Sequence, residues 1–266
     1  MVIVMNELAL NFDHVTVRRG SKMLLQDFTW QLPTGSHWAV LGPNGAGKTT
    51  MLRIAATLLY PSEGTVDILG HRFGRVDTRE LRKTIGVVDP KQKFSNMPAE
   101  EIVLSGLTAS NGLLPRWEAT QEELDRCARM LDMVGMAARA RRMWADMSQG
   151  EKARTLIARA LIIEPALLLL DEPSTGLDLP GRETLLKVID NLRATLPELT
   201  TVMITHHVEE IAASTTDILL IKDAQLLAAG PASEVLTAAH LSRLYDISVS
   251  VETLRGRWFA FEEAVH

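Results

Sequence analysis

The chain has 266 residues, of which 46% are hydrophobic and 23% are charged, values typical of a globular protein with an ample core. Its formal net charge of −5 argues against a broad positive field that would attract nucleic acid or acidic lipid. The single cysteine, Cys127, excludes an intramolecular disulfide and a cysteine-based metal cluster, and we expect it to be a small buried side chain on a helix.

The sequence shows neither a targeting signal nor a membrane span. Its opening, MVIVMNELAL, lacks a basic first region and its apolar part is too short for a signal peptide. The apolar stretches, such as LLLL at 167–170, fall far short of the roughly 20 residues needed to cross a bilayer. We therefore expect a cytoplasmic protein, for which a partner would have to supply any membrane span.

The first third of the chain reads as strands around a glycine-rich loop. Residues 8–41 have the pattern of strands and turns, ending in an apolar strand at 37–41 that enters the loop. A helical pattern begins at Lys48 and should stop at Pro61. Residues 65–69 resemble a hairpin strand.

From about 92 to 160 the pattern is helical. Thr120 and Glu123 form a candidate capping box at the start of one helix. After Gly150, a second helix carries Ala153, Leu156, Ile157 and Ala160 on one face. Trp117 and Trp144 also lie in this section, where packing and contact with a partner both remain open.

Strands then alternate with helices. Strands are expected at 166–171, 201–205 and 217–222, with helices at 181–196 and 208–213. This alternation predicts a largely parallel sheet covered on both faces, in one α/β domain that spans 1–266 and contains the helical section as an insertion. The extension at about 231–266 has a helical pattern around Leu236, Leu241 and Leu244 and a strand pattern at 247–251, and no function is assigned to it.

A phosphate-binding loop follows the strand at 37–41. Its pattern G-x-x-x-x-G-K-[ST] is filled by Gly42, Pro43, Asn44, Gly45, Ala46, Gly47, Lys48 and Thr49. Glycines let backbone N–H groups approach phosphate oxygens, and the helix that follows points its positive end at the same anion. Lys48 is predicted to reach the β- and γ-phosphates, and the Thr49 hydroxyl to bind Mg²⁺.

Two carboxylates end the apolar strand at 167–170. Asp171 and Glu172 stand at the carboxyl end of a buried strand, where open α/β sheets bind ligands. Beside a phosphate loop, Asp171 is predicted to hold Mg²⁺, and Glu172 to act as the general base that polarises the attacking water.

Three further segments narrow the choice among the many families that share a phosphate loop and an acidic strand end. They are MSQGEKARTLIARAL at 147–161, EPSTGLD at 172–178 and TVMITHH at 201–207, and Ser148 lies 23 positions before Asp171. In order and spacing, the chain resembles the ATP-binding cassette (ABC) ATPase domain over about residues 7–246, with a signature of the S-Q-G-E form. The resemblance implies a P-loop NTPase core with an N-terminal β-subdomain and a helical subdomain inserted at about 92–160.

The resemblance also implies roles for individual residues. Ser148, Gln149 and Gly150 would contact the γ-phosphate held by the opposite subunit, and Gln149 replaces the usual glycine without removing the amide donors. Thr50 joins the ATP-binding set of the phosphate loop, His206 matches the switch histidine, and His207 is interpreted as a bystander. Asp178 is expected to shape the seam of a dimer.

Three assignments remain open in the sequence. Arg19 aligns with the family's adenine-stacking aromatic residue, but a plain surface arginine is equally compatible. Gln92 is the candidate glutamine for the Mg²⁺ or water ligand of the Q-loop, although it does not directly follow a strand. The cluster Arg139, Arg141 and Arg142 is interpreted as a solvated helical face and not as a nucleic-acid site.

The resemblance implies an ATP- and Mg²⁺-dependent hydrolase that works as a head-to-tail dimer, with a second copy of itself or a paralogous cassette. We expect it to drive a separate permease from the cytoplasmic face of the inner or plasma membrane, without binding nucleic acid. The alternative is a soluble ABC ATPase that acts in assembly, regulation or nucleic-acid repair. A non-catalytic ATP sensor is disfavoured because Glu172 and His206 are both present.

Overall fold

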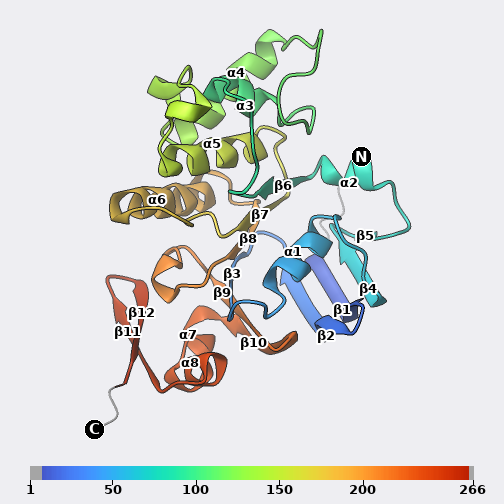
Figure 1. Ribbon diagram of the computed structural model, residues 1–266, viewed down its shortest axis with the longest axis vertical. Helices are drawn as coiled ribbons and strands as arrows, with labels where there is room; N and C mark the ends of the chain where they lie inside the picture. Colours follow the sequence, from blue (N-terminus) through green and yellow to red (C-terminus); the bar gives the residue numbers. More distant parts are fainter. Residues whose placement is uncertain (1–7, 264–266) are drawn as a thin grey trace.

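The computed structural model describes residues 8–263, arranged as two large sheets and a two-stranded hairpin, with helices around them (Figure 1). The expectation about a signal peptide concerns the opening segment, whose residues 1–7 lie outside this part, as do residues 264–266 of the extension. Among residues 8–263, no helix combines the length and the apolar character that a bilayer crossing requires.

The central sheet has six strands in the order β10-β9-β3-β8-β7-β6. The five strands from β9 to β6 run parallel, and β10 pairs with β9 antiparallel. The predicted, largely parallel sheet is therefore confirmed. The strands are β3 (His37–Leu41), β6 (Ile85–Val88), β7 (Leu167–Asp171), β8 (Thr200–Ile204), β9 (Asp217–Lys222) and β10 (Gln225–Pro231).

An antiparallel sheet in the order β2-β1-β4-β5 packs against one face of the central sheet. Phe12, Phe28 and Trp30 meet through their rings in the apolar layer between the two sheets, with centroids 5.8–6.5 Å apart. Its strands are β1 (Leu8–Arg19), β2 (Lys22–Pro33), β4 (Glu63–Ile68) and β5 (His71–Arg72), and the helix α1 (Lys48–Ala55) shares this layer.

Helices cover the opposite face of the central sheet. Successive residues of a strand point to opposite faces, so Leu167 and Leu169 pack toward the antiparallel sheet, whereas Leu168 and Leu170 pack toward the helices. This layer comprises α3 (Ala99–Leu104), α4 (Gln121–Met133), α5 (Gln149–Leu161) and α6 (Leu179–Thr195), with short 3₁₀ turns η1 (Ala137–Arg139) and η2 (Trp144–Asp146). A further helix, α2 (Thr78–Arg82), precedes β6.

Packing accounts for both tryptophans of the helical section. Trp117 and Trp144 are half-buried against the apolar layer of the helices, and Trp144 meets Phe94 edge to face with ring centroids 5.3 Å apart. Cys127 is buried on α4, as expected.

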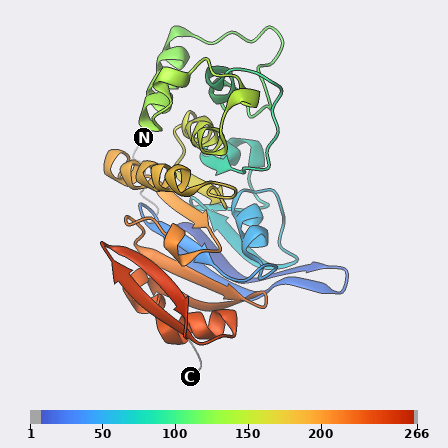
Figure 2. The same ribbon diagram turned by 60° about the vertical axis from the view of Figure 1, so that its left-hand side comes forward.

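The C-terminal part of the chain packs on the face of β3 and β9 that lies opposite the antiparallel sheet (Figure 2). It contains α7 (Ala232–Val235), α8 (Ala238–Tyr245) and a hairpin formed by β11 (Val249–Leu254) and β12 (Arg257–Glu262). The helix predicted around Leu236, Leu241 and Leu244 is two short helices, because Leu236 ends α7 whereas the fully buried Leu241 and Leu244 lie on α8. The strand predicted at 247–251 corresponds to β11. The sequence did not predict β10 or β12.

One predicted helix begins as expected but is shorter, and another is only a short turn. The helix from Lys48 ends at Ala55, well before Pro61, because Thr57 adopts a left-handed backbone conformation and its carbonyl accepts from the Arg82 guanidinium at 2.8 Å. The helix predicted at 208–213 is only the 3₁₀ turn η3 (Val208–Glu210), in which the Glu210 carboxylate accepts from the Thr205 hydroxyl and holds the segment in a tight loop.

The predicted capping box at the start of α4 is confirmed and supports a stability test. The Thr120 hydroxyl accepts from the Glu123 backbone N–H at 3.3 Å, and the Glu123 carboxylate accepts from the Thr120 N–H at 2.8 Å. We predict that Thr120→Ala lowers the free energy of unfolding by about 1 kcal/mol, measured by urea denaturation. Arg129→Ala, at an exposed position of the same helix, is the control, and a loss equal to that of Thr120→Ala would contradict a capping role.

Candidate nucleotide site

The phosphate loop leaves the carboxyl end of β3 and closes onto α1. Gly42 passes so near the Ile221 carbonyl that a Cβ atom would collide with it. Gly47 has φ of +112°, and a Cβ there would lie 2.6 Å from the Leu24 carbonyl oxygen. The loop therefore needs glycine at both positions, for close backbone approach and for the left-handed turn into the helix.

Lys48 is buried beneath this loop, with 4% of its surface exposed. Its Nζ donates to the carbonyl oxygens of Gly42 at 2.6 Å and Pro43 at 2.9 Å. Burial lowers the pKa of Lys48, while the nearby charges of Glu172 and Asp171 oppose the shift. The ammonium group is thus held at the loop by weak neutral acceptors that an anionic ligand can replace.

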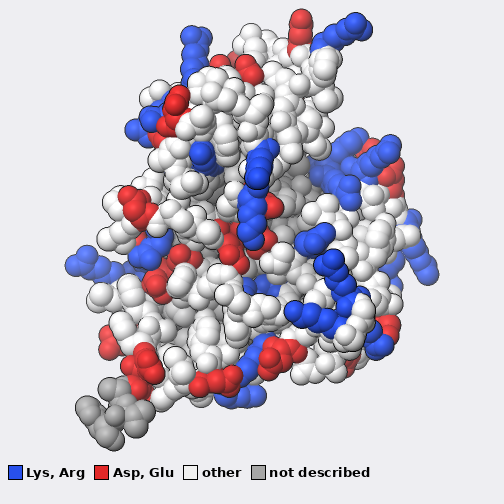
Figure 3. Space-filling model, in the orientation of Figure 1, with Lys and Arg blue, Asp and Glu red and all other residues white. Residues whose placement is uncertain are grey.

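The surroundings of the loop favour an anion. Gly47 is the N-cap of α1, and no side chain caps the free N–H groups of that helix end. Lys22 lines the pocket of about 200 Å³ over the loop, and Arg18, Arg19 and Arg53 line a hollow beside it. Basic side chains also gather over α1 and the β1–β2 region in Figure 3, so the chain's overall negative charge does not extend to this surface.

Arg19 therefore lies in the hollow next to the loop, as adenine stacking would require. This hollow shares Leu24, Thr49 and Thr50 with the phosphate-loop pocket. Its walls also include Val17 and Leu59, which supply apolar surface. Stacking of Arg19 on a base stays a prediction.

The acidic pair follows β7, two strands away from the phosphate loop in the sheet. Asp171 is the last residue of β7, and its Oδ1 is buried without a hydrogen-bond partner in residues 8–263. Burial raises the pKa of Asp171, and the Glu172 charge raises it further, while Lys91 and Lys48 oppose this shift. An unpaired buried carboxylate oxygen costs free energy unless a cation or a donor satisfies it.

The orphaned Oδ1 of Asp171 fits a bound cation. Mg²⁺ prefers oxygen ligands, and the Thr49 hydroxyl lies in the adjoining pocket beside Lys48. Thr49 and Asp171 therefore offer oxygen atoms of the kind that Mg²⁺ takes as ligands. Both assignments remain predictions.

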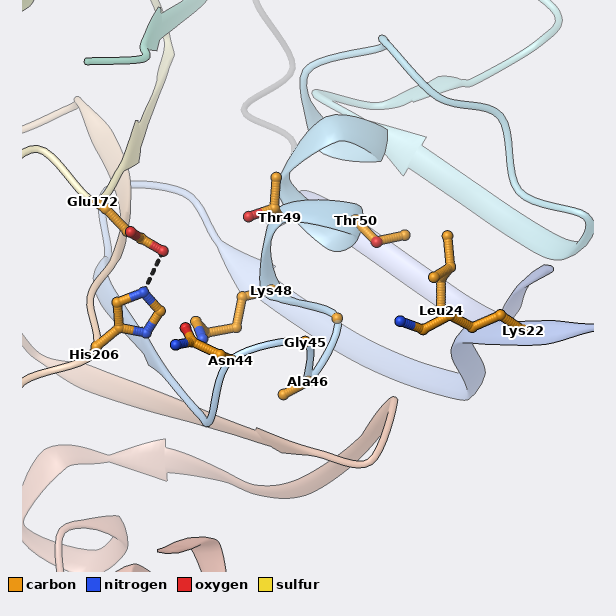
Figure 4. A pocket seen from close by; sticks show the side chains of 11 residues that line it. Lys22, Leu24, Asn44, Gly45, Ala46, Lys48, Thr49, Thr50, Glu172 and His206 are labelled. Carbon is orange, nitrogen blue, oxygen red and sulfur yellow. Dashed lines mark ion pairs between the residues drawn. The ribbon is translucent and has the colours of Figure 1, made fainter. Parts of the chain in front are cut away.

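Glu172 and His206 contact each other, which the sequence did not predict. Glu172 Oε1 lies 2.5 Å from His206 Nε2, and both side chains line the pocket over the phosphate loop (Figure 4). Glu172 also has φ of +53°, an uncommon conformation for a residue with a side chain. Strained backbone of this kind often occurs at functional positions, and here it carries the carboxylate proposed as the general base.

Gln92 does not lie with these residues. It is absent from the lining of the phosphate-loop pocket, and its Nε2 donates to Asn111 Oδ1 at 2.7 Å. In the segment after β6, the charges of Asp89 and Lys91 instead affect the pKa of Asp171. Gln92 as a ligand of Mg²⁺ or water therefore stays a prediction that this arrangement does not support.

The signature residues form a second, separate hollow. Ser148 and Gln149 are exposed, and with Gly150 they face Gly176, Asp178 and Gly181 across a space of about 390 Å³. Asp178 is the N-cap of α6, and its Oδ1 accepts from the Gly181 N–H at 3.0 Å. None of these residues lines the phosphate-loop pocket. One chain thus contains two surfaces that lie apart.

A capping box orients the Ser148 hydroxyl. Its oxygen accepts from the Glu151 N–H at 3.2 Å, while the Glu151 carboxylate accepts from the Ser148 N–H at 2.8 Å. The serine uses only an acceptor lone pair for this bond, so its O–H proton remains available to an anion outside.

Two arginines of the basic cluster contact Glu151 in the first turn of α5. Arg139 Nη1 lies 2.5 Å and Arg142 Nη1 3.5 Å from Glu151 Oε1, and the Glu151 side chain is buried. The prediction of a solvated helical face is therefore wrong in part. The three arginines are exposed, but Arg141 and Arg142 lie outside any helix, and Arg139 and Arg142 pair with a buried carboxylate of the signature.

Comparison with known proteins agrees with this geometry. The family model described as ABC transporter matches residues 25–175, more than half of the chain. A putative ABC transporter ATP-binding protein of Streptococcus mutans is 35% identical, with 96% of this chain and 99% of that protein covered. An uncharacterized ABC transporter ATP-binding protein of Bacillus subtilis is 37% identical, with 91% and 92% covered.

A solved structure of a dimeric ATP-binding cassette in a post-hydrolysis state, bound to ADP and Pi, superposes with a TM-score of 0.70. It is 26% identical, with 84% of this chain and 98% of that chain covered. A cassette ATPase is thus the class that fold and site define. The chain belongs to the ABC transporter family, as one of its ATP-binding and ATP-hydrolysing subunits.

The buried Lys48 supports the first test of the site. We predict that Lys48→Ala loses most ATP affinity and all measurable hydrolysis, because the β- and γ-phosphates lose their fixed cation. Binding of a fluorescent ATP analogue and phosphate release would measure both effects. Lys83→Ala removes an exposed lysine that lies after α2, outside the pocket lining, and is the control. Near-normal turnover of Lys48→Ala would remove the phosphate-loop assignment.

Proposed function

We propose that two copies of this chain, or one copy and a paralogous cassette, bind two ATP molecules at their interface and hydrolyse them to drive a separate membrane permease. Each ATP would lie between the phosphate loop of one subunit and Ser148, Gln149 and Gly150 of the other. The separation of the two hollows supports this arrangement, because the pocket over Lys48 contains no residue of the signature. A second copy supplies the missing wall.

The phosphate loop would bind the substrate through residues 42–50. Backbone N–H groups at the start of α1 and the Lys48 ammonium face the phosphates, and Lys48 exchanges its two carbonyl contacts for phosphate oxygens. Thr50 lines the same pocket. Thr49 and Asp171 would hold Mg²⁺, which when bound neutralises charge on the β- and γ-phosphates.

Hydrolysis needs a water aligned with the γ-phosphate. Glu172 would accept a proton from this water while the water oxygen forms a bond to the γ-phosphorus. The bond between the γ-phosphorus and the oxygen shared with the β-phosphate breaks, which gives ADP and phosphate. The His206 imidazole, held 2.5 Å from Glu172 in the chain, would turn toward the γ-phosphate and orient the water. The Ser148 hydroxyl of the opposite subunit would donate to the same phosphate.

The proposed permease explains how the chain would act on transport. Family membership, and the finding that no helix in residues 8–263 suits a bilayer crossing, both support a separate membrane-embedded partner. The chain would then lie on the cytoplasmic face of the inner or plasma membrane, bound through the helical section.

A trapped dimer tests the shared site. We predict that Glu172→Gln slows hydrolysis by about 10²–10⁴-fold, because the amide keeps the shape of the side chain but cannot take the water's proton. ATP with Mg²⁺ should then shift the variant from monomer to dimer in size-exclusion chromatography, whereas ADP should not, since it lacks the γ-phosphate that Ser148 must bind.

The control adds Ser148→Arg, whose bulk and charge block the contact across the interface. The double variant should bind ATP but remain monomeric. ATP-induced dimers of the double variant would overturn the head-to-tail arrangement, and an unchanged rate for Glu172→Gln would overturn the role of the base.

The permease proposal has its own test. We predict that affinity capture of the tagged chain from detergent-solubilised membranes recovers a protein with several membrane spans, and that reconstitution with it raises the low basal ATPase rate. Lys48→Ala should capture the same partner without stimulated hydrolysis, which separates binding from activity. Recovery of soluble proteins alone would favour a soluble ABC ATPase that acts in assembly, regulation or repair.

A further inference from the structure

The C-terminal hairpin lies directly against the loop that carries the switch histidine. Figures 1 and 2 both show β11 and β12 beside the segment that follows β8. In Figure 1 this segment lies between α6 and the hairpin. Residues 206–209 and residues 260–262 line one shallow hollow between the loop and the hairpin. The extension, to which the sequence assigns no role, thus reaches the catalytic edge of the sheet.

Arg257, the first residue of β12, fastens this loop to α6. One guanidinium nitrogen, Nη1, lies 2.6 Å from the Glu183 carboxylate on α6. The other, Nη2, donates to the backbone carbonyl of Glu209 in η3. The Arg257 side chain is mostly buried, so solvent screens these contacts less than it would on an open surface. The planar guanidinium fixes the distance between α6 and the loop.

Tyr245 holds the other end of the loop. Its hydroxyl donates to the backbone carbonyl of His206 itself at 3.3 Å. Burial raises the pKa of Tyr245 to about 12, so the hydroxyl, protonated at neutral pH in any tyrosine, also remains a donor at moderately alkaline pH. The two contacts therefore hold the segment 206–209, called the switch loop below, at the carbonyl groups of His206 and Glu209.

The hairpin and α8 are anchored firmly enough to act as a fixed support. The Lys222 ammonium at the end of β9 donates to the Arg243 carbonyl at 2.6 Å and contacts Asp246 at 2.5 Å. The Val249 N–H donates to the Ser242 hydroxyl at 2.9 Å, which joins β11 to α8. Leu241, Leu244 and Val249 are buried in the same apolar cluster.

We propose that α8 and the hairpin form a brace for the switch loop, with Tyr245 and Arg257 as positioning residues that hold the His206 backbone where its imidazole meets Glu172. The brace rests on the proposed role of His206 in hydrolysis. It acts on the catalytic step and not on ATP affinity, because neither residue lines the phosphate-loop pocket.

Substitution of the brace tests this inference in the full-length chain. We expect Arg257→Ala to lower kcat about tenfold, since small displacements of a catalytic group cost this much or more, while the Kd for ATP stays unchanged. Arg257→Lys, which keeps a cationic donor, should recover part of the rate. Arg255→Ala, an exposed arginine at the turn of the same hairpin, is the matched control and should resemble the wild type.

Hydrogen–deuterium exchange supplies a readout that does not depend on activity. Arg257→Ala and Tyr245→Phe should both raise deuterium uptake in a peptide covering 205–211, with the phosphate loop unchanged. Tyr245→Phe keeps the buried ring and therefore stays informative if Arg257→Ala folds poorly. Normal kcat and normal uptake in both variants would overturn the brace, and so would equal losses of kcat and ATP affinity, which indicate general destabilisation.

His206→Ala separates this inference from the proposed mechanism. If His206→Ala leaves hydrolysis intact, the role of the histidine fails, and the brace as a catalytic support fails with it. If His206→Ala abolishes hydrolysis while Arg257→Ala and Tyr245→Phe hydrolyse normally, only the brace fails.

Discussion

The parallel run of β3, β8 and β7 is the constraint on which the site depends. These strands are neighbours in the central sheet and point the same way, so the segments that leave their carboxyl ends emerge side by side. Backbone hydrogen bonds continue the pairing beyond the strands, from Thr205 N–H to the Val40 carbonyl and from Glu172 N–H to the Ile204 carbonyl, both at 3.1 Å. The sheet thereby brings phosphate loop, switch loop and acidic pair together.

Most charged groups at this edge have partners within the chain, which the proposed ligand would replace. Lys48 is satisfied by carbonyls of its own loop, and Glu172 by His206. Asp171 Oδ1 is the exception, because it is buried without a donor in the described part of the chain. When a phosphate chain binds with its cation, Lys48 would contact phosphate oxygens, His206 would leave Glu172, and the cation would satisfy Asp171. Binding would then leave no buried polar group of this set unpaired.

The sequence predicts the elements that a local pattern of residues determines. It does not predict the features that depend on contacts between residues far apart in the chain. The phosphate loop, β7 and α4 are recognisable because glycine spacing, an apolar run and a capping box are local signals. The early end of α1 depends on Arg82, 25 residues beyond Thr57, and no local pattern marks it. Contact between Glu172 and His206 likewise needs the strand order, which the sequence does not state.

The basic cluster shows the same limit from another side. Arg139 and Arg142 look like surface charge until α5 places the buried Glu151 within reach of both guanidinium groups. Removing one partner of a buried charge lowers stability more than removing an exposed ion pair does. These arginines therefore stabilise the Glu151 carboxylate that caps the helix at Ser148, although they contact no ligand. Exposure alone is a poor guide to their role.

The first turns of α6 join the two halves of the shared site within one subunit. Gly181 and Thr184 line the signature hollow, while Glu183 between them binds Arg257, which holds the switch loop. A second copy that binds at the signature hollow, as proposed, would contact the same helix to which Arg257 is bound. Such contiguity transmits a signal only if the His206 side chain has two discrete arrangements. The pair between His206 and Glu172 supplies the first, and a histidine turned toward a γ-phosphate would be the second.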